Sequence, residues 1–322
     1  MIPVLNRPFL EHIIAYLKNY QVEEIVLAVS YLPEVIQQYF SGDTSCGVRL
    51  TYAVESSPLG TAGAVKNAER YLDSTFIVLN GDIFTGLNLA DMLALHRQKR
   101  AKATISLTWV DNPSAFGVVE TDSEGRVLRF VEKPPPDQAT SHWINAGIYI
   151  LEPDVLKHVP ADSFHMFERG LFPRLLELGE PVYGYPFNDY WLDMGMADKY
   201  LQLSSDLLQS VARSALIGDF GRDEVRCDRG VSIHRSVVIV GPVVIGGGCQ
   251  IGQGVRIIGP AVLGPDCRIA GAARIERAVL WRGVEVAAGA VLDGCVAGND
   301  ARIDGNNQAV SGFCLDLSEK AR

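Results

Sequence analysis

Apolar residues follow two different rhythms along the chain, and the first of them covers residues 1 to about 190. Leu10, Ile13, Ile14 and Leu17 recur at helical spacing, whereas residues 25–29 form one continuous apolar run. Such a run is typical of a strand that is buried on both faces of a parallel sheet. The same reasoning predicts further strands near residues 48–54, 76–80 and 104–110, and helices near residues 33–40, 62–72 and 89–99. This alternation predicts a three-layer α/β domain, which here opens directly with a helix.

A helical pattern at about residues 196–211 comes next along the chain. The second rhythm begins after it, and its apolar residues recur every six positions. Its aliphatic positions are Ile233, Ile239, Ile245, Ile251, Ile257, Leu263, Ile269 and Ile275, and a mostly small residue follows each of them four positions later, from Val237 to Val279. These hexapeptide repeats predict a left-handed parallel β-helix in which each aliphatic side chain stacks on the one a coil below. A β-sandwich of short strands is the alternative, but its strands do not keep a strict period. After Ile275 the phase slips by one residue, to Leu280.

Length and composition agree with two domains of a cytoplasmic protein. The chain has 322 residues, 48% of them hydrophobic and 21% charged, so we expect one domain over residues 1–212, connecting helix included, and a β-helix over residues 225–312. The net charge of −9 argues against a nucleic-acid partner, although a local lysine or a metal ion can still bind a small anion. The six cysteines lack metal-ligand spacing, and no stretch is long and apolar enough to enter a membrane.

Two segments in the first domain have the composition of a nucleotide site. Residues 55–64 (ESSPLGTAGA) form a small-residue loop before a helix, where backbone N–H groups can approach a base or a phosphate. Residues 76–82 (FIVLNGD) place Asp82 at the carboxyl end of a strand, the edge at which α/β sheets bind ligands, and its hard oxygen suits Mg²⁺. Taken singly, the first could be a plain strand-to-helix loop and the second a turn or helix-cap aspartate.

Two further segments add charge. Lys133 follows a strand and precedes three prolines, so its ammonium could hold a phosphate monoester, while Glu132 and Asn145 could bind sugar hydroxyls. Asp193 lies among aromatic and apolar residues, and a carboxylate there is costly to bury without a partner. A metal ion shared with Asp82 would supply one. Glu132 and Lys133 could equally be a solvated strand end.

In this order the segments resemble the sugar-1-phosphate nucleotidyltransferases (NDP-sugar pyrophosphorylases), over essentially the whole chain. The resemblance rests on residues 58–63 (PLGTAG), 80–82 (NGD), 132–134 (EKP), 144–147 (INAG) and 191–193 (WLD). Within the family the sequence is most similar to bacterial mannose-1-phosphate guanylyltransferases that carry a C-terminal β-helix. The resemblance therefore implies a Rossmann-like nucleotidyltransferase domain, a nucleoside triphosphate, most simply GTP, and a sugar 1-phosphate, most simply mannose 1-phosphate.

The resemblance also implies a role for each candidate residue. The nucleotide would be bound by Leu59, Gly60, Thr61, Asn80 and Gly81, and the sugar by Gly117, Glu132 and Asn145. Asp82 and Asp193 would hold Mg²⁺, and these two residues with Lys133 would form the catalytic set. We expect a homo-oligomer that associates through the β-helix.

One departure from the family pattern concerns the start of the sequence. The family opens with a strand and a glycine-rich loop that holds the triphosphate, and this sequence begins just after that segment. We expect the first strand of the domain to be lacking, pyrophosphorylase turnover to be impaired and the chain to aggregate, as in a truncated gene product. A non-catalytic regulatory subunit that binds a sugar nucleotide is the alternative, as is a thymidylyl-, uridylyl- or adenylyltransferase acting on glucose 1-phosphate. An acyltransferase using His234, the histidine of the β-helix, is a third.

Overall fold

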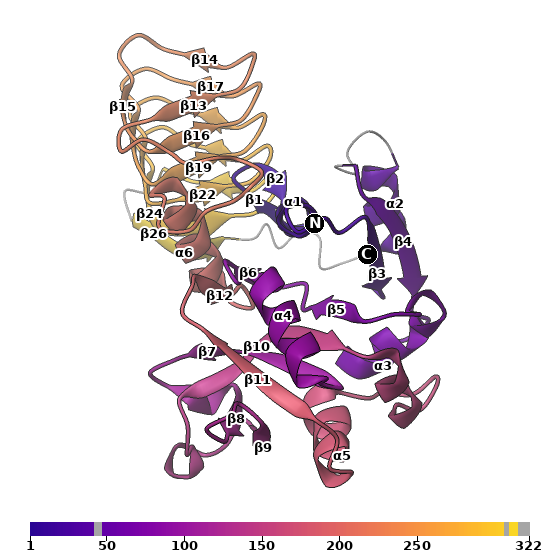
Figure 1. Cartoon of the computed structure of the whole chain (residues 1–322). Helices are drawn as coiled ribbons and strands as arrows, with labels where there is room; N and C mark the ends of the chain where they lie inside the picture. The colour runs from indigo at the N-terminus through magenta and orange to yellow at the C-terminus, as the bar shows by residue number, and fades with distance from the viewer. Residues whose placement is uncertain (42–46, 306–308, 315–322) are drawn as a thin grey trace. The chain divides into compact units, whose positions relative to one another are not determined.

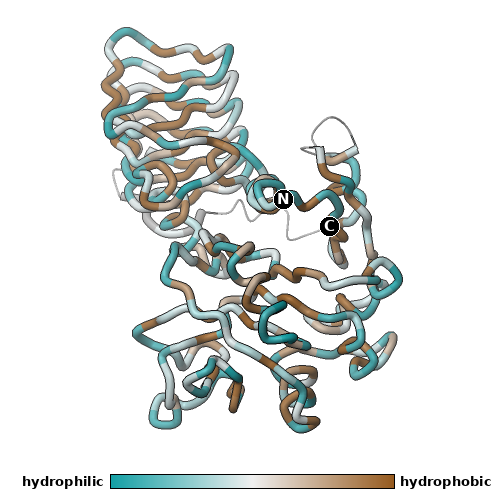
Figure 2. Tube along the Cα trace, viewed as in Figure 1, coloured by the Kyte–Doolittle hydropathy of each residue, from teal (hydrophilic) through white to brown (hydrophobic). Residues whose placement is uncertain are grey.

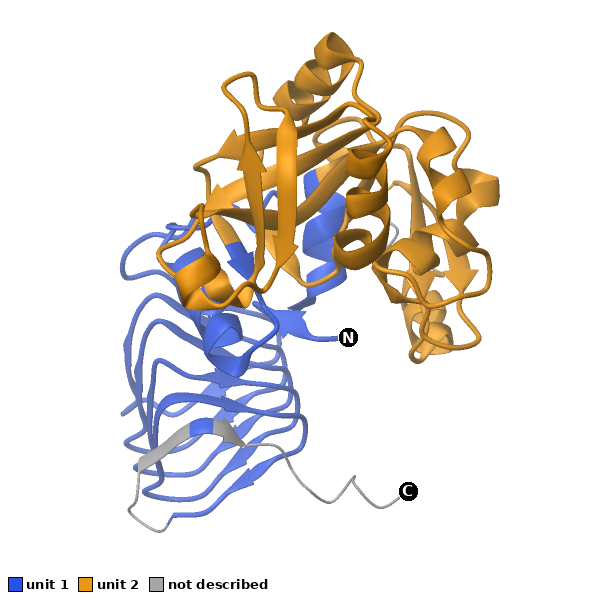
Figure 3. Ribbon diagram, turned by 90° about the horizontal axis from the view of Figure 1, so that it is seen from below, with its two compact units in different colours: residues 1–16, 192–322 blue, residues 17–191 orange. Residues whose placement is uncertain are grey.

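The computed structural model describes residues 1–41, 47–305 and 309–314, and these residues divide into two compact units. Unit 1 contains residues 1–16 and 192–322, and unit 2 contains residues 17–191 (Figure 3). The predicted division into domains at residues 212–225 differs from these units and stays a prediction.

Unit 2 is built on a six-stranded mixed sheet. Its order is β11 (Val182–Phe187), β7 (Ala103–Trp109), β10 (Trp143–Leu151), β8 (Gly117–Thr121) and β9 (Val127–Glu132), and β5 (Phe76–Leu79) also pairs with β10 (Figure 1). Only β7 and β11 run parallel, and the other neighbours are antiparallel. The short strand β6 (Ile83–Thr85) follows β5.

Helices cover both faces of this sheet, which gives the three layers that the sequence predicts. Helix α4 (Leu89–Lys99) packs on β7, β10 and β11. Its buried residue His96 forms a hydrogen bond with the side chain of Thr104. Ile105 points to the opposite face because side chains alternate along a strand. There it joins an apolar core with residues of α3 (Gly60–Asn67), the π-helix η6 (Phe167–Leu171) and α5 (Phe172–Glu177). Short 3-10 helices, Glu69–Tyr71, Pro113–Ala115, Pro136–Gln138 and Pro153–His158, complete unit 2.

The apolar run at residues 25–29 is a strand, but the prediction that it is buried on both faces is wrong. Strand β3 (Glu24–Val29) pairs in parallel with β4 (Arg49–Val54) in a separate two-stranded sheet, and α2 (Pro33–Phe40) connects them. Each residue of β3 is half-buried or exposed, because the strand has a single partner among the described residues.

The chain opens with a tight hairpin rather than directly with a helix, so that prediction is also wrong. Strands β1 (Pro3–Val4) and β2 (Arg7–Pro8) pair before α1 (Phe9–Lys18) begins. Leu5 and Asn6 form the turn with left-handed φ angles of 47° and 64°. Two successive residues of this conformation make the turn that suits the twist of a two-residue hairpin.

The rest of unit 1 consists of α6 (Ala197–Leu208), β12 (Trp191–Asp193), whose last two residues belong to this unit, and a stack of short parallel strands. The stacked strands are β13 (Val225–Cys227), β14 (Ser232–Ile233), β15 (Val238–Val240), β16 (Val243–Ile245), β17 (Gln250–Ile251), β18 (Arg256–Ile258), β19 (Ala261–Leu263), β20 (Arg268–Ile269), β21 (Arg274–Glu276), β22 (Val279–Leu280), β23 (Glu285–Val286), β24 (Val291–Ala297), β25 (Arg302–Ile303) and β26 (Ala309–Cys314). Residues 306–308 of the predicted β-helix lie outside the described residues.

The register of this stack is compatible with a β-helix. Ile239 lies opposite Ile257, which lies opposite Ile275, so the predicted column repeats every 18 residues. Ile257 and Ile275 are fully buried, and apolar positions recur down the stacked strands (Figure 2). Beyond Ile275 the partner is Leu292, only 17 residues later, as the phase slip predicts.

One position of the repeat differs from the prediction. Ile233 is 41% exposed because, among the described strands, β14 pairs with β17 alone, at the end of its sheet. Farther along the stack, Ala278 rather than Val279 joins the interior cluster, because the coil has become one residue shorter before this point. Four cysteines, Cys227, Cys249, Cys267 and Cys295, are free thiols, whereas Cys46 and the side chain of Cys314 lie outside the described residues.

Candidate active site

Several predicted site residues of unit 2 come together at one edge of its sheet. Strand β5 ends one residue before Asn80, and the antiparallel strand β10 brings Asn145 to the same edge. The Asn80 N–H donates to the Gly147 carbonyl at 2.9 Å. Gly117, the first residue of β8, lies opposite Glu132, the last residue of β9. Chain segments up to 65 residues apart in sequence, from Asn80 to Asn145, thus meet at this edge.

Glycine is required at two points where these segments touch. A Cβ atom on Gly147 would lie 2.9 Å from Nδ2 of Asn80, and the residue has a φ of +76°. A Cβ atom on Gly117 would lie 2.7 Å from the Phe130 ring and 2.8 Å from the Glu132 carboxylate. Contacts this short force the neighbours to move, so the glycines allow the close approach of the strands around the site.

The predicted nucleotide loop is held by its own neighbours in unit 2. The Glu55 carboxylate accepts from the Leu59 N–H at 2.9 Å, and Leu59 itself is buried. The N–H groups of Ala62 and Gly63 both donate to the carbonyl of His165 at 3.0 Å. These two amides at the start of α3 are therefore committed to the protein. Gly60, with a φ of +72°, precedes them.

Glu168 on the π-helix η6 is a residue of this region that the sequence analysis missed. The residue is 8% exposed, and its carboxylate accepts from the Thr61 hydroxyl at 3.2 Å and from the Tyr149 hydroxyl at 3.4 Å. The Asn145 side-chain amide donates to Tyr149 at 2.8 Å. The signal that could have found Glu168 is an isolated carboxylate within an otherwise largely apolar stretch, residues 164–172 (FHMFERGLF).

The charged groups near Glu168 influence one another. Burial, together with the negative charge of Glu168, raises the pKa of Glu132, and the positive charges of Lys133 and Arg169 oppose this effect. Burial and the same carboxylate raise the pKa of Tyr149 well above its usual value, so Tyr149 is a neutral donor. Lys133 itself is exposed, takes a left-handed φ of 47° and donates its backbone N–H to Phe116 at 3.0 Å.

The WLD motif reaches the same edge through its tryptophan. Trp191 donates its indole N–H to the Ala146 carbonyl at 2.9 Å, and its ring packs edge-on against Phe116 at a centroid distance of 5.7 Å. Ala146 and Phe116 belong to the segments that carry Asn145 and Gly117. Trp191 therefore joins two of the predicted sugar-binding segments.

The two predicted magnesium ligands belong to different units. Asp82 and Gly81 are exposed in the turn between β5 and β6 of unit 2. In unit 1, Oδ1 of Asp193 accepts from the Gly195 N–H at 2.8 Å. No group of three or more metal-ligating side chains occurs among the described residues. Mg²⁺ is usually held by one or two carboxylates and substrate phosphates, so the donor set fits the ion. The shared site stays a prediction.

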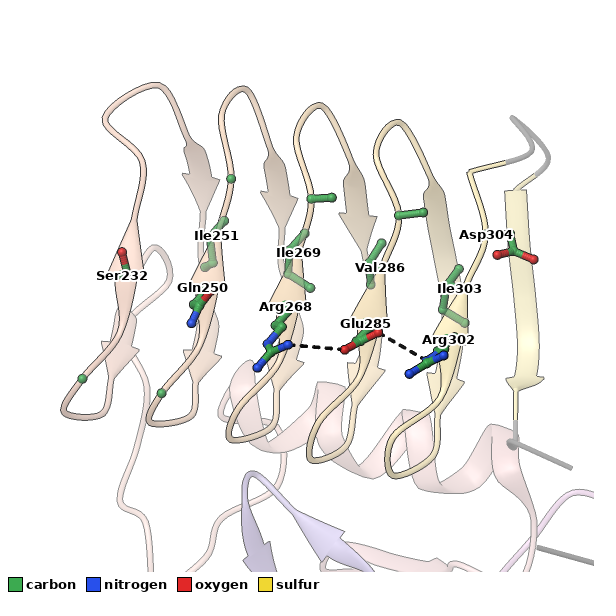
Figure 4. A pocket seen from close by; sticks show the side chains of 15 residues that line it. Ser232, Gln250, Ile251, Arg268, Ile269, Glu285, Val286, Arg302, Ile303 and Asp304 are labelled. Carbon is green, nitrogen blue, oxygen red and sulfur yellow. Dashed lines mark ion pairs between the residues drawn. The ribbon is translucent and has the colours of Figure 1, made fainter. Parts of the chain in front are cut away.

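A hollow lies within unit 1, on the sheet formed by β14, β17, β20, β23 and β25 (Figure 4). Glu285 pairs there with Arg268 at 3.6 Å and with Arg302 at 3.3 Å, so these charges largely neutralise one another. None of the described residues that line the hollow is a histidine, and His234 is exposed with Nδ1 bonded to Ser236. The hollow therefore gives no support to acyl transfer.

Comparison with known proteins assigns the family. The model of the nucleotidyl transferase family matches residues 1–210. The chain belongs to this family. It is 36% identical over 299 residues to a mannose-1-phosphate guanylyltransferase of Mycobacterium tuberculosis, a match that covers 91% of this chain and 76% of the relative. It is 33% identical over 327 residues to a UTP–glucose-1-phosphate uridylyltransferase of Synechocystis, covering 91% and 84%.

A solved structure also resembles this nucleotidyltransferase. HddC from Yersinia pseudotuberculosis, which has also been crystallised with GMP-PN, is 28% identical and superposes with a TM-score of 0.56 over 63% of this chain and 87% of its own. The protein is accordingly a sugar-1-phosphate nucleotidyltransferase whose substrates are a nucleoside triphosphate and a sugar phosphate. None of the helices in the described part of the chain could span a bilayer.

Proposed function

We propose that the protein transfers a guanylyl group from GTP to mannose 1-phosphate, giving GDP-mannose and pyrophosphate. The observation that carries this proposal is the meeting of Asn80, Gly117, Glu132 and Asn145 at one sheet edge. The choice of substrates is supported by the names of relatives such as the M. tuberculosis enzyme and by the GMP-PN complex of HddC.

In the proposed reaction an oxygen of the sugar phosphate attacks the α-phosphorus in line and the bond to pyrophosphate breaks. A sugar phosphate is already an anionic nucleophile, so the side chains have only to position it and neutralise charge. The exposed ammonium of Lys133 would bind the sugar phosphate, and Glu132 and Asn145, beside Gly117, would bind its hydroxyls. Leu59, Gly60, Thr61, Asn80 and Gly81 would surround the nucleotide.

Asp82 and Asp193 would hold Mg²⁺ in this scheme. When bound, the ion would neutralise phosphate charge and orient the nucleotide. The two carboxylates would serve as its hard oxygen ligands. The Gly195 N–H that bonds to Oδ1 of Asp193 would fix the rotamer of that ligand.

Two other functions use the same edge. The Synechocystis relative supports a uridylyltransferase that acts on glucose 1-phosphate, and thymidylyl or adenylyl transfer would need the same sugar-phosphate contacts. A regulatory subunit would bind a sugar nucleotide at the same residues without turnover.

The test combines turnover with binding. We expect GTP and mannose 1-phosphate to release pyrophosphate at a higher rate than any other pair of substrates. The other pairs combine GTP, UTP, dTTP or ATP with mannose 1-phosphate or glucose 1-phosphate. A higher rate with UTP and glucose 1-phosphate would replace this proposal with the uridylyl one. Calorimetric binding of GDP-mannose without turnover would support the regulatory subunit.

A lysine pair tests the sugar-phosphate contact. Lys133→Met should weaken mannose 1-phosphate binding or raise its KM by at least about tenfold, because a charge-assisted contact contributes about 1.5–3 kcal/mol. Lys102→Met is the matched control, since Lys102 is paired with Asp154 at 2.7 Å in the same unit. Equal effects of the two substitutions would contradict the role of Lys133.

We further infer that the strand stack is a left-handed β-helix of hexapeptide repeats, that it joins the protein into a homo-oligomer, and that the enzyme acts in the cytoplasm. The 18-residue register and the buried Ile257 and Ile275 support the first of these inferences.

A further inference from the structure

Two chains of hydrogen bonds in unit 2 end on the Glu168 carboxylate. In the first, the Phe167 N–H donates to the Thr61 hydroxyl at 3.0 Å and Thr61 donates to Oε2 of Glu168 at 3.2 Å. The second reaches Oε1 of Glu168 through the Tyr149 hydroxyl, which receives a bond from Asn145. The nucleotide loop and the sugar-binding segment are thus connected through one carboxylate.

In the second chain of hydrogen bonds, each residue donates to the next one, from the sheet edge to Glu168. The Asn80 N–H donates to Gly147, the Gly147 N–H donates to Oδ1 of Asn145, and Nδ2 of Asn145 donates to Tyr149, which donates to Glu168. A carboxylate only accepts, so it forces the Tyr149 O–H to point toward it and leaves the Tyr149 oxygen to accept from Asn145. Glu168 and the Gly147 N–H together therefore determine which end of the Asn145 amide faces Tyr149.

We propose that Glu168 is a positioning residue that orients the Asn145 amide and the Thr61 hydroxyl together, so that sugar recognition is coupled to the nucleotide loop. The proposal rests on the function proposed above. With one N–H of Nδ2 bonded to Tyr149, Asn145 retains a second N–H in a fixed direction. The preferred ligand is a sugar hydroxyl whose oxygen accepts a hydrogen bond at that point.

Replacing Glu168 with glutamine keeps the shape and removes one acceptor. A glutamine side chain has one oxygen and one NH₂ group, so it cannot accept from Thr61 and Tyr149 through different atoms. If its NH₂ group faces Tyr149, that hydroxyl must find another acceptor, and the nearest rearrangement turns the Asn145 amide around. The turned amide would place its NH₂ group against the Gly147 N–H, which is unfavourable.

The first arm of the test needs no ligand. In protein labelled with 15N-asparagine, the Asn145 side-chain signal is assigned by its loss in Asn145→Asp. Glu168→Gln and Tyr149→Phe should both shift this signal and speed exchange of its protons by about tenfold, as expected for the loss of one hydrogen bond. Glu152→Gln is the matched control, because Glu152 accepts from Thr75 and contacts His96 in the same unit.

The second arm measures the contribution of the sugar as the ratio of the Kd values for GDP and GDP-mannose. Glu168→Gln should reduce this ratio by up to about tenfold, the effect of one lost hydrogen bond between neutral groups. It should change the ratio no further in the Asn145→Ala background. Additive effects, or a wild-type Asn145 signal in Glu168→Gln, would overturn the proposal. Tyr149→Phe provides the second variant if Glu168→Gln does not fold.

The two arms separate this inference from the proposed function. If the wild-type protein binds neither guanine ligand but binds UDP-glucose, the proposed substrates are wrong and the same ratio is measured with UDP and UDP-glucose. If it binds no sugar nucleotide, the proposed function fails and the coupling to sugar recognition fails with it. The asparagine signal then still decides whether Glu168 orients Asn145.

Discussion

Protonation of one buried histidine should destabilise unit 1 at moderately acidic pH. His12 on α1 is 2% exposed, with Nδ1 bonded to the Ser214 hydroxyl at 2.8 Å and Nε2 bonded to the Val4 carbonyl at 3.1 Å. Burial lowers the pKa of His12 from 6.5 to about 4. The Val4 carbonyl and Glu11 act in the opposite direction, and Arg7 adds to the lowering.

The size and sign of the effect follow from this pKa. The folded state prefers neutral His12, so its contribution to stability is complete above pH 6.5 and is lost as the pH falls toward 4. Lowering the His12 pKa from 6.5 to about 4 corresponds to a loss of about 3.4 kcal/mol of unfolding free energy at a pH low enough to protonate His12 in both the folded and the unfolded state. At pH 4.5 about 2.5 kcal/mol of this has been lost relative to pH 7.5.

The assay has to follow unit 1 separately, because two units need not unfold together. Trp281 lies in unit 1 and donates to Tyr200, so its 19F signal in protein labelled with 5-fluorotryptophan reports on that unit during urea unfolding. His12→Gln removes the titrating ring and should reduce the loss of stability between pH 7.5 and 4.5 by about 2.5 kcal/mol. An equal loss in the variant and the wild type would refute the reasoning.

Two further predictions concern the strand stack and the metal. Ile257→Ala should lower the unfolding free energy of unit 1 by about 2–5 kcal/mol, as for other buried isoleucines. The control Val238→Ala, at a 43% exposed position, should lower it by less than about 1 kcal/mol, and urea unfolding measures both changes. Asp82→Asn and Asp193→Asn should each weaken Mg²⁺-dependent nucleotide binding in calorimetry without changing the circular dichroism spectrum, with Asp73→Asn as control. Carboxylates of Asp82 and Asp193 more than about 10 Å apart in a ligand-bound crystal structure would exclude a shared ion, which must lie about 2.1 Å from each.

The strand stack could be predicted in detail because its pattern is local and repetitive. The six-residue period predicts the same inward position in each repeat, and Ile257 and Ile275 are both buried. The error falls where the repeat has a boundary, because Ile233 is exposed at the end of its sheet. The position of the lost residue within the coil cannot be read from the period alone, and the structure places Ala278 in the interior there.

The sheet of unit 2 was less predictable because strand pairing depends on distant parts of the chain. The pattern located β5 and β7, but it does not contain the information that β10 runs antiparallel to both. The prediction that β3 is buried on both faces failed for the same reason. Its apolar residues are typical of a central strand, yet burial depends on the neighbours that the fold supplies.

The sequence could predict which segments contribute to the candidate site, but not the hydrogen bonds that connect them. The sequence identified Glu132 and Asn145 as candidate sugar-binding residues, and the structure brings their segments together. Glu168 could not be connected with them from the sequence. Its link to Asn145 passes through Tyr149, which reads as an ordinary buried aromatic residue of β10.

The geometry of β10 explains why the INAG motif contains a glycine. In a regular strand, residues four apart are separated by about 13 Å, too far for Asn145 to bond to Tyr149 when both side chains stand on the same face. In β10, Asn145 lies opposite Leu107 and Tyr149 lies opposite Ile105, so the four-residue step on β10 spans only two residues of β7. Gly147 lies inside this bulge with a φ of +76°, a conformation that glycine adopts without strain. The glycine therefore shortens the strand, and the shortened strand brings Asn145 within 2.8 Å of the tyrosine that connects it to Glu168.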